Sequence, residues 1–533
     1  MVSLPAQHSA FSRRGPVVVI GAGIGGLAAA LRLTAAGRDV TVIEAADAPG
    51  GKIRQAPRAA GGVDAGPTVL TLRAVFDELF AAAGAELDDH VTLHRQEILA
   101  RHWWPGSGPL DLFADAGRSE AAVRAFAGPR AADEFRAFNA RAKTLFDGFR
   151  APVIESAVPE LSALVRTVAA RPALLRAMAP GRSLDAVLRR DLTDPRLRQL
   201  FGRYATYVGG SPYRSPGLLA LIWQAEAGGV WAVEGGMHAL ARAIAALIEA
   251  RGGRIRLNAP VARILTDSDG VTGVALAGGA VVPAAHVIFN GDPRALPLGL
   301  LGSGIADVAP RTRDAPRSLS AQVWAFASAI DGPALTHHNV FFCADPRAEF
   351  AALERGETPD DTTLYLCAQD RGFGRPPPAR ERFEIILNAP PLTGGRPDPE
   401  EFERCHTRTF QTLRRFGLTF ADSPDRAALT TPDQFDARFP GSAGSLYGQS
   451  PHGMTAALAR PTARTTVPGL WLAGGGCHPG AGVPMAALSG RHAAEAILKD
   501  RTSTLPSPRT ATPGGMSTRF RIAARAPFRS SGS

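Results

Sequence analysis

The stretch PVVVIGAGIGGLAAAL, residues Pro16–Leu31, decides the fold of this chain. A short β-branched run, Val17–Ile20, leads into glycines spaced as G-x-G-x-x-G, and the Ala/Leu-rich residues after them predict a helix. Gly21 permits a tight turn, Gly23 lets the backbone approach a pyrophosphate, and Gly26 lets the helix pack closely on its strand. The N-terminus of that helix then offers amide N–H groups to phosphates.

A second apolar run follows the helix and ends in an acid. Val40–Ile43 predicts another buried strand, and Glu44 stands at its end, 18 residues after Gly26. A carboxylate at this position can accept hydrogen bonds from ribose hydroxyls. The glycine spacing alone is weak, but strand, glycines, helix, strand and terminal acid together predict a dinucleotide-binding site.

The next loop favours FAD over NAD. Two glycines and then cations follow within ten residues of Glu44, in Pro49-Gly50-Gly51-Lys52-Ile53-Arg54. The glycines let backbone lie close to a flat or charged ligand, and Lys52 or Arg54 can neutralise a pyrophosphate. An ordinary loop with two solvated charges is the alternative, but an NAD site does not need a second phosphate-facing loop.

A glycine cluster near the C-terminus is the second informative segment. It reads LAGGGCHPGAGVPMAALSGRHAAEAIL over Leu472–Leu498, which predicts a strand, a turn and a helix that begins near Pro484. A helix N-terminus beside the N1/C2=O edge of a flavin stabilises the negative charge of its reduced form. A plain strand–turn–helix is the alternative.

Composition sets the outer bounds. With 533 residues, 45% hydrophobic and 20% charged, the chain is expected to fold into two domains. Four scattered cysteines fit a reducing compartment, and the sequence predicts no transmembrane helix. The net charge of +10 includes six arginines in residues 501–533, a segment without acids that reads as a disordered basic tail. No nucleic-acid fold accompanies this tail, so we expect no nucleic-acid partner and consider anionic lipid or no ligand instead.

The pattern along the chain predicts an α/β fold: a Rossmann-type FAD-binding domain with an inserted α+β substrate domain, both discontinuous. The expected FAD-binding segments are residues 15–100, 238–300 and 460–500, and the expected substrate-domain segments are 101–237 and 301–459. Strands are expected near Ser320–Ala329, Thr363–Ala368 and Phe383–Ala389. Val261 is expected where a backbone amide and carbonyl can meet the adenine.

These motifs resemble a known family. Gly50-Gly51-Lys52, the stretch VDAGPTVL at Val63–Leu70 and HPGAGVP at His478–Pro484 resemble the phytoene-desaturase-type carotenoid oxidoreductases, which share the amine-oxidase fold. Four further stretches resemble the branch that desaturates 1-hydroxycarotenoids at the 3,4 bond, the hydroxyneurosporene or methoxyneurosporene desaturases. They are ARHWW at Ala100–Trp104, FGRYATYVGGSP at Phe201–Pro212, LIWQAEAGGVWAVEGGMHAL at Leu221–Leu240 and FNGDPRAL at Phe289–Leu296.

The resemblance covers about residues 16 to 498 and implies FAD, a pocket for an acyclic C40 polyene, and a place on a membrane surface from which to draw it. The predicted cofactor-binding residues come from the glycine loop, the ribose acid, the second loop, the adenine-facing strand and the last helix. They are Gly21, Gly23, Gly25, Gly26, Glu44, Gly51, Lys52, Arg54, Gly66, Pro67, Thr68, Val261, Gly475, Gly476, Val483, Pro484 and Met485.

The expected chemistry asks little of side chains. Desaturation removes a hydride and a proton from adjacent carbons, and binding geometry contributes most of the rate. Weak candidates for the proton acceptor are His102, Glu226, Glu234 and His478, with a structural role favoured for His478 in its turn. Candidate tunnel walls are Trp103, Trp104, Tyr204, Tyr207, Trp223 and Trp231, although core packing is the favoured explanation for each. We expect no metal site, because His337-His338 and Cys405-His406 have no partner at ligand spacing.

One segment is a candidate for membrane contact. Residues 161–190 carry six arginines against one acid, Asp185, and their apolar residues recur at helical spacing. This basic amphipathic pattern suits a bilayer surface, although packing of the apolar stripe on the core explains it equally well. The sequence thus favours a cytoplasmic protein, peripheral on the inner membrane, and gives no oligomeric state.

Three classes of function follow. The leading hypothesis is a hydroxycarotenoid 3,4-desaturase. A phytoene desaturase, a carotene isomerase or a more distant amine oxidase is the alternative. A non-catalytic lipid-binding relative, of the kind of the Rab GDP-dissociation inhibitors, is the third, although those proteins lack the intact flavin motifs present here.

Overall fold

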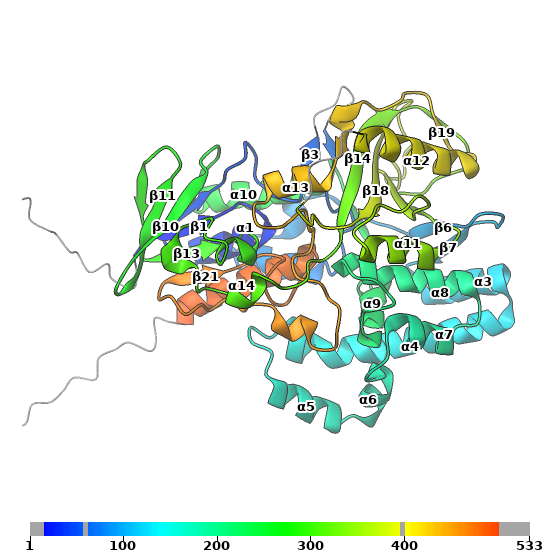
Figure 1. Ribbon diagram of the computed structural model, residues 1–533, viewed down its shortest axis with the longest axis horizontal. Coiled ribbons are helices and arrows are strands. Elements are labelled where there is room, and N and C mark those ends of the chain that lie inside the picture. Colours follow the sequence, from blue (N-terminus) through cyan, green and yellow to red (C-terminus); the bar gives the residue numbers. More distant parts are fainter. Residues whose placement is uncertain (1–14, 57–61, 395–399, 500–533) are drawn as a thin grey trace, which may run out of the picture.

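Figure 1 shows the computed structural model, which describes residues 15–56, 62–394 and 400–499. The predicted basic tail therefore lies outside the described residues. The molecule has three main parts. A nucleotide-binding half lies on the left of the figure, a mixed sheet lies at the upper right, and a layer of helices lies below that sheet.

The nucleotide-binding half is built on a five-stranded parallel sheet in the order β21-β13-β1-β2-β9. Residue Val17 pairs with Val40 on one side and with His286 on the other. The strands at the centre are buried and read as continuous apolar runs because both faces are covered. The strands are Leu470–Leu472 (β21), His286–Phe289 (β13), Val17–Ile20 (β1), Val40–Ile43 (β2) and Arg254–Arg256 (β9).

Helices cover one face of this sheet and a small antiparallel sheet lies against it. The helices are Ile24–Ala35 (α1), Ala74–Ala81 (α2), Met237–Ala250 (α10) and Val483–Lys499 (α14). The small sheet consists of Val261–Asp267 (β10), Gly270–Leu276 (β11) and Val281–Pro283 (β12). Strands of the main sheet thus come from three separated parts of the chain, as the discontinuous architecture requires.

Helices α1 and α14 approach each other through glycines. A Cβ added at Gly490 would lie 2.1 Å from the carbonyl oxygen of Gly25, and one at Gly25 would lie 2.7 Å from the amide of Gly474. Only residues without a side chain allow backbone to pass this closely. The contact joins the first glycine loop to the last helix, 465 residues apart in the chain.

The second half is built on a seven-stranded mixed sheet in the order β20-β14-β18-β17-β16-β6-β7. The three strands predicted here are confirmed, as β14, β18 and β17. The predicted domain boundary at residue 100 falls inside β6, which pairs with β7 and β16. The strands are Leu429–Thr430 (β20), Ser320–Ser328 (β14), Glu381–Ala389 (β18), Leu364–Ala368 (β17), His338–Phe341 (β16), Ile98–Trp103 (β6) and Leu110–Phe113 (β7).

Helices pack on this sheet and below it (Figure 1). Those flanking the sheet are Pro346–Glu354 (α11), Glu401–Arg415 (α12) and Pro432–Arg438 (α13). The lower layer consists of Ala116–Ala127 (α3), Pro129–Phe149 (α4), Leu161–Ala169 (α5), Pro172–Met178 (α6), Leu184–Asp191 (α7), Pro195–Gly202 (α8) and Ile222–Ala227 (α9). An aromatic cluster around Phe135, Phe201 and Trp223 holds this layer together.

Shorter elements connect these layers. Two-stranded ribbons are formed by Gln55–Ala56 (β3) with Val63–Asp64 (β4), Leu93–Arg95 (β5) with Trp231–Val233 (β8), and Ile330–Asp331 (β15) with Thr419–Phe420 (β19). Short helical turns include Arg150–Ile154 (η2), Arg203–Val208 (η3), Gly217–Leu221 (η4) and Ala456–Ala459 (η9). None of the helices formed by residues 15–56, 62–394 and 400–499 has the length and apolarity needed to span a bilayer.

Candidate functional site

The first glycine loop has the close approaches that the sequence predicts. Gly21 has a φ of +94°, and its amide donates to the carbonyl of Ile43. A Cβ at Gly26 would lie 2.2 Å from the carbonyl oxygen of Gly21, so helix α1 can start here only with glycine. Gly23 precedes α1 as its N-cap residue, and backbone amides at a helix N-terminus of this kind can bind phosphates.

Glu44 stands where the predicted ribose acid should be. One carboxylate oxygen accepts a hydrogen bond from the amide of Ala22 at 2.6 Å, and the other accepts from the amide of Ala46 at 2.9 Å. The segment before Val261 runs beside it, because the amide of Ala259 donates to the carbonyl of Glu44. Val261 begins β10 and is half-buried, so it flanks the same end of the sheet.

The second loop packs against the first. The amide of Gly50 donates to the carbonyl of Ala22, and a Cβ at Gly51 would lie 3.1 Å from the Cα of Gly23. Gly66 closes the loop from the other side, where a Cβ would lie 1.9 Å from the carbonyl oxygen of Lys52. The two glycine-rich loops therefore form one cradle of backbone.

The two cations of this loop are engaged by distant parts of the chain. Lys52 Nζ donates to the carbonyl of Leu446 at 2.5 Å, and burial lowers the pKa of Lys52 to about 8. Arg54 donates to Thr430 Oγ1 at 2.7 Å, and burial followed by the charge of Arg438 lowers its pKa to about 10. Both cations are thus buried and held by protein groups, while their role toward a pyrophosphate stays a prediction.

A buried group of charges lies beneath this loop. Arg317 forms an ion pair with Asp292, and Arg460 donates to the carbonyl of Gly475 at 2.9 Å. The pKa of Lys52 responds to all three of these side chains. Three cations around one carboxylate leave net positive charge in this buried region, which suits an anionic ligand.

The last helix presents its N-terminus to a cavity. Val483, Pro484 and Met485 are the first residues of α14, and all three line the cavity. The preceding turn is tight, since a Cβ at Gly476 would lie 2.5 Å from the ring of Pro293, and the peptide between His478 and Pro479 is cis. Gly475 and Gly476 therefore carry β21 into this turn as predicted.

The cavity, of about 420 Å³, runs from the last helix to the lower helical layer. Pro67 and Thr68 form one wall together with Val483–Met485, and residues of strands β17 and β18 line the cavity as well. Toward the lower helical layer the lining is mostly apolar. It includes Phe146, Phe149, Val153, Ile154, Leu164, Met178, Leu218, Leu219, Leu221 and Ile222.

These features fit FAD. The two glycine loops meet at the N-terminus of α1, Glu44 at the end of β2 would hold the ribose, and the first residues of α14 would lie beside the flavin ring. The net positive charge beside Lys52 suits the pyrophosphate or the negative edge of a reduced flavin. A mostly apolar cavity then continues from the wall formed by Thr68 and Val483–Met485, as a polyene substrate requires.

Glu226 is the one of the four predicted proton acceptors that lines the cavity. His102 lies on β6 beside the stacked rings of Trp104 and Phe342, with Nδ1 3.2 Å from the carbonyl of Leu110, and burial lowers its pKa to about 3. The other two candidates face elsewhere. Glu234 pairs with His94 and Arg375, and His478 Nε2 lies 2.8 Å from the carbonyl of Ser156.

Of the six aromatic residues predicted to line the tunnel, two line the cavity and four do not. Tyr204 and Tyr207 line the cavity. The four tryptophans Trp103, Trp104, Trp223 and Trp231 pack in hydrophobic clusters instead. Arg203, Tyr365 and Tyr447 line the cavity as well and were missed, although Arg203 stands beside Tyr204 in the quoted stretch FGRYATYVGGSP.

Strand pairing gives His337-His338 a partner that their spacing did not reveal. β16 pairs with β17, which places His338 opposite Cys367, and the ligand atoms of His337, His338 and Cys367 lie within 4.8 Å of one another. His337 Nδ1 lies 2.6 Å from the carbonyl of Arg371, and His338 Nδ1 lies 2.7 Å from Tyr365 Oη. The expectation that the histidine pair stands alone is therefore wrong.

Residues 24–498 match the family described as flavin containing amine oxidoreductase, and the chain belongs to this family. FAD is its cofactor. Over 488 residues the chain is 57% identical to the hydroxyneurosporene desaturase of Cereibacter sphaeroides and 51% identical to that of Rhodobacter capsulatus. Each alignment covers 91% of this chain and 98% of the relative. A lycopene-forming phytoene desaturase of a Paracoccus species is 33% identical over 91% of this chain and 98% of its own length.

Solved structures share the fold. An oxidoreductase from Methanosarcina mazei superimposes with a TM-score of 0.56 at 18% identity, over 90% of this chain and all of the other. Cyclohexylamine oxidase from Brevibacterium oxydans gives a TM-score of 0.55 at 16% identity, over 91% of this chain and 99% of the other. The predicted Rossmann-type FAD-binding fold with an inserted substrate domain is therefore confirmed.

Proposed function

We propose that this chain is an FAD-dependent desaturase of acyclic C40 carotenoids that introduces the 3,4 double bond into substrates with a 1-hydroxy or 1-methoxy end group, such as 1-hydroxyneurosporene. The observation that carries the proposal is the apolar cavity that starts at the flavin wall. The sequence identity to two hydroxyneurosporene desaturases over nearly their whole length supports the same substrate class.

The reaction removes a hydride from one carbon of a saturated C–C bond and a proton from the next, and a C=C bond forms. Bound FAD supplies the acceptor for the hydride, and the proton passes to water or a side chain. The residues of the chain contribute position: Pro67 and Thr68 with Val483–Met485 set the plane of the flavin wall, and β17 with β18 holds the polyene against it. The apolar lining excludes water from the reacting bond.

Substrate comparison tests this proposal. The purified flavoprotein is incubated with 1-hydroxyneurosporene, 1-methoxyneurosporene, neurosporene and phytoene in liposomes, and products are separated by chromatography. We expect the oxygenated neurosporenes to lose two hydrogen atoms at the 3,4 position. Multi-step conversion of phytoene to lycopene would support the phytoene-desaturase alternative, and rearrangement without loss of hydrogen would support an isomerase. Carotenoid binding without turnover would support the lipid-binding class.

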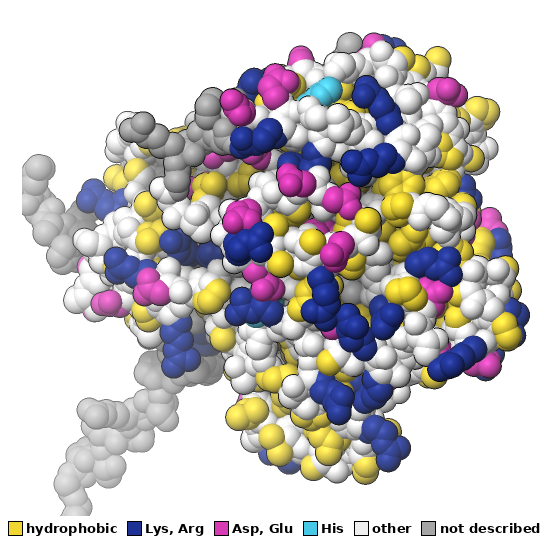
Figure 2. Space-filling model, turned by 45° about the vertical axis from the view of Figure 1, so that its right-hand side comes forward, with side chains coloured by type: hydrophobic (Ala, Val, Ile, Leu, Met, Phe, Trp, Pro, Cys, Tyr) yellow, Lys and Arg dark blue, Asp and Glu magenta, His cyan; other side chains and the backbone are white. Residues whose placement is uncertain are grey.

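We also propose that the protein works at a membrane surface through α5 and α6. Large apolar side chains are exposed here: Leu161 is 65% exposed, Val165 58% and Leu175 48%. Figure 2 shows hydrophobic side chains among arginines on this lowest part of the molecule. Other residues of the same helices face inward, because Leu164 and Met178 line the cavity. One helix pair thus connects an exposed apolar surface with the cavity, as a substrate drawn from a bilayer requires.

Liposome binding tests this second proposal. The triple change Leu161→Gln, Val165→Gln and Leu175→Gln should release the protein from anionic liposomes, since it removes exposed apolar surface without touching the core. A matched control changes three exposed apolar residues of the nucleotide-binding half, Val281, Leu298 and Leu300, to glutamine. Equal sedimentation of both variants with liposomes would contradict membrane contact at α5 and α6.

A further inference from the structure

The mostly apolar lining of the cavity contains a cluster of charged and phenolic side chains, here called the polar region. It lies where η3 and α9 face β17, and α9 stands between the seven-stranded sheet and α4 in Figure 1. Arg203, Tyr204, Tyr207, Glu226 and Tyr365 meet there. Glu226 is only 5% exposed and Tyr204 only 2%.

These side chains hold the Glu226 carboxylate in place. Tyr207 Oη donates to Glu226 Oε2 at 3.0 Å, and Arg203 Nη1 donates to Tyr207 Oη at 3.2 Å. The Arg203 guanidinium lies over the ring of Tyr207 at 5.1 Å and over the ring of Tyr365 at 5.5 Å. Burial raises the pKa of Glu226, while Arg203, Tyr207 and Tyr204 act in the opposite direction.

Binding of a pure hydrocarbon does not require buried charged groups such as Glu226 and Arg203. Burying a carboxylate and a guanidinium costs free energy that their mutual attraction only partly offsets. An apolar wall of the same volume would bind a polyene at least as well. The polar region is therefore expected to serve a polar part of the ligand.

The position of the polar region relative to the flavin wall restricts which polar part of the substrate it can contact. Tyr365 Oη lies 2.8 Å from Thr68 Oγ1, and Arg203 contacts both Tyr365 and Tyr207, so these side chains link Glu226 to the wall formed by Thr68 and Val483–Met485. In a 1-hydroxycarotenoid the hydroxyl oxygen is three to four bonds from the 3,4 carbons, roughly 5 Å with carbon–carbon bonds of about 1.5 Å. A receptor for that hydroxyl must accordingly line the cavity onto which this wall opens, as Glu226 does.

We propose that Glu226, held by Tyr207 and Arg203, accepts a hydrogen bond from the tertiary hydroxyl of the substrate's end group and so selects which carbon–carbon bond lies at the flavin. The inference rests on the proposed function and deepens it. The hydroxylated end enters the cavity first, and the remaining polyene extends through the apolar part toward α5 and α6.

The proposal defines the preferred substrate chemically. A free tertiary alcohol can donate to the carboxylate, whereas a methoxyl group cannot, and a hydrocarbon end leaves the buried carboxylate without a new partner. Sites built to hydrogen-bond a hydroxyl reject analogues that lack it by roughly 10⁴-fold. We expect the hydroxyl end group to be preferred over both the methoxyl and the hydrocarbon end groups.

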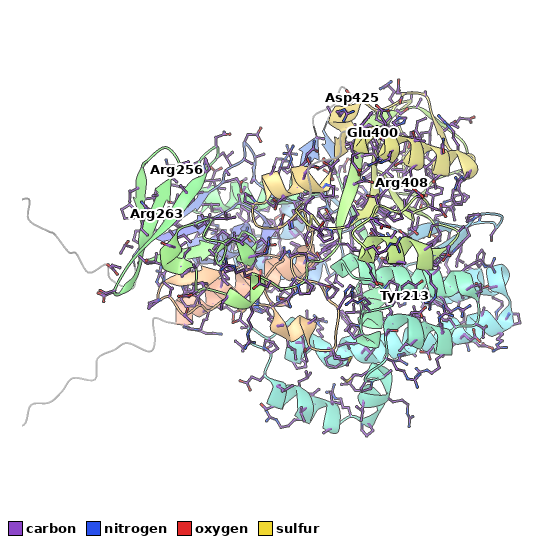
Figure 3. All side chains as sticks on the ribbon, viewed as in Figure 1. Tyr213, Arg256, Arg263, Glu400, Arg408 and Asp425 are labelled. Carbon is purple, nitrogen blue, oxygen red and sulfur yellow. The ribbon has the colours of Figure 1, made fainter. Side chains whose placement is uncertain are left out.

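The experiment compares four variants of the full-length flavoprotein with wild type: Glu226→Leu, Glu226→Gln, Tyr207→Phe and Tyr213→Phe. Tyr213, labelled in Figure 3, is the matched control for loss of a phenol, since it does not line the cavity and its ring packs against Arg347. For each protein, kcat/KM is measured with 1-hydroxyneurosporene and with neurosporene. Binding of each carotenoid is measured by quenching of tryptophan fluorescence, and FAD content and Tm report on folding.

We expect wild type to prefer the hydroxylated substrate at least 100-fold. Glu226→Leu should reduce the ratio of the two kcat/KM values, and the ratio of the two binding constants, to within about tenfold of unity, because no acceptor remains. Glu226→Gln should keep most of the preference through its amide oxygen. Tyr207→Phe removes the hydrogen bond that positions the Glu226 carboxylate, so the preference for the hydroxylated substrate should fall several-fold. Tyr213→Phe should show the same preference as wild type.

The possible outcomes distinguish failure of the proposed desaturase function from failure of the proposed role of Glu226. Failure of wild type to desaturate 1-hydroxyneurosporene overturns the proposed function. Desaturation by wild type with an unchanged substrate preference in Glu226→Leu overturns the inference alone. Loss of turnover on both substrates in Glu226→Gln, with carotenoid binding intact, assigns Glu226 to proton removal and likewise overturns it. Should Glu226→Leu fail to retain FAD, an undiminished preference in Tyr207→Phe overturns the inference.

Discussion

The contact between α1 and α14 makes a strong prediction about Gly490. A Cβ at this position would lie 2.1 Å from the carbonyl oxygen of Gly25 and 2.9 Å from the amide nitrogen of Ala29. Ordinary contact begins near 3.4 Å, so Gly490→Ala must push the two helices apart by about 1 Å. Overpacking of this kind costs about 1–3 kcal/mol.

The consequence extends to the cofactor, since α14 begins with Val483–Met485 at the flavin wall. We expect Gly490→Ala to lower Tm by roughly 2–6 °C and to raise the Kd for FAD about tenfold, which corresponds to ~1.4 kcal/mol of binding free energy. Tm is measured by thermal melting of the holoprotein, and Kd by quenching of FAD fluorescence on titration of the apoprotein.

Gly108→Ala is the control, because a Cβ there meets nothing within 4 Å. It adds the same methyl group outside the helix contact and should leave both quantities unchanged. If Gly490→Ala is indistinguishable from Gly108→Ala in Tm and in Kd, the close helix contact does not position the flavin wall.

Three further predictions concern charge and hydrogen bonding. Glu44→Ala leaves the amide of Ala22 without its acceptor and removes the ribose contact, so FAD titration should show at least tenfold weaker binding, about 1.4 kcal/mol or more; full FAD affinity would show that the acid is misassigned. Glu226 accepts a hydrogen bond more strongly when ionised than when protonated, and its pKa is raised by burial against the influence of Arg203, Tyr207 and Tyr204; kcat/KM profiles from pH 8 down to pH 5 should therefore show the hydroxyl preference declining with acid toward the value of Glu226→Gln, and a preference that rises with acid contradicts the role of the carboxylate. The pKa of His102 is about 3 in the folded chain against 6.5 unfolded, so the unfolded state binds more protons between these values and stability falls as pH drops through that window; urea unfolding should show a shallower acid decline for His102→Phe, by up to about 2 kcal/mol at pH 5, and an identical slope rules the histidine out as the cause.

The nucleotide site was predictable from sequence because its parts are local. Gly21, Gly23, Gly26 and Glu44 lie within one strand–helix–strand unit, and each close approach follows from backbone geometry that glycine alone permits. The strands β14, β17 and β18 were predictable for a similar reason, as apolar runs bounded by turn residues.

The polar region of the cavity was predictable only in part: Tyr204, Tyr207 and Glu226 were candidates from sequence, but the contacts that bring Tyr365 to this region join distant segments. Arg203 reaches Tyr365 over 162 residues of sequence, and Thr68 reaches the same tyrosine over 297. The long-range partner of Lys52 could not be predicted from sequence either. The sequence reveals its charge beside two glycines, but only the structure shows the carbonyl of Leu446 that it binds.

The proposed end-group chemistry is tested most directly by a single turnover without oxygen. Holoprotein on anionic liposomes is mixed anaerobically with 1-hydroxyneurosporene, flavin absorbance is followed, and the carotenoid is extracted and identified. The account predicts that the flavin absorbance bleaches as one molecule of the 3,4-didehydro product forms for each bound FAD, with no bleaching by phytoene on the same time scale. Bleaching by phytoene, or an unchanged flavin spectrum with 1-hydroxyneurosporene, would contradict it.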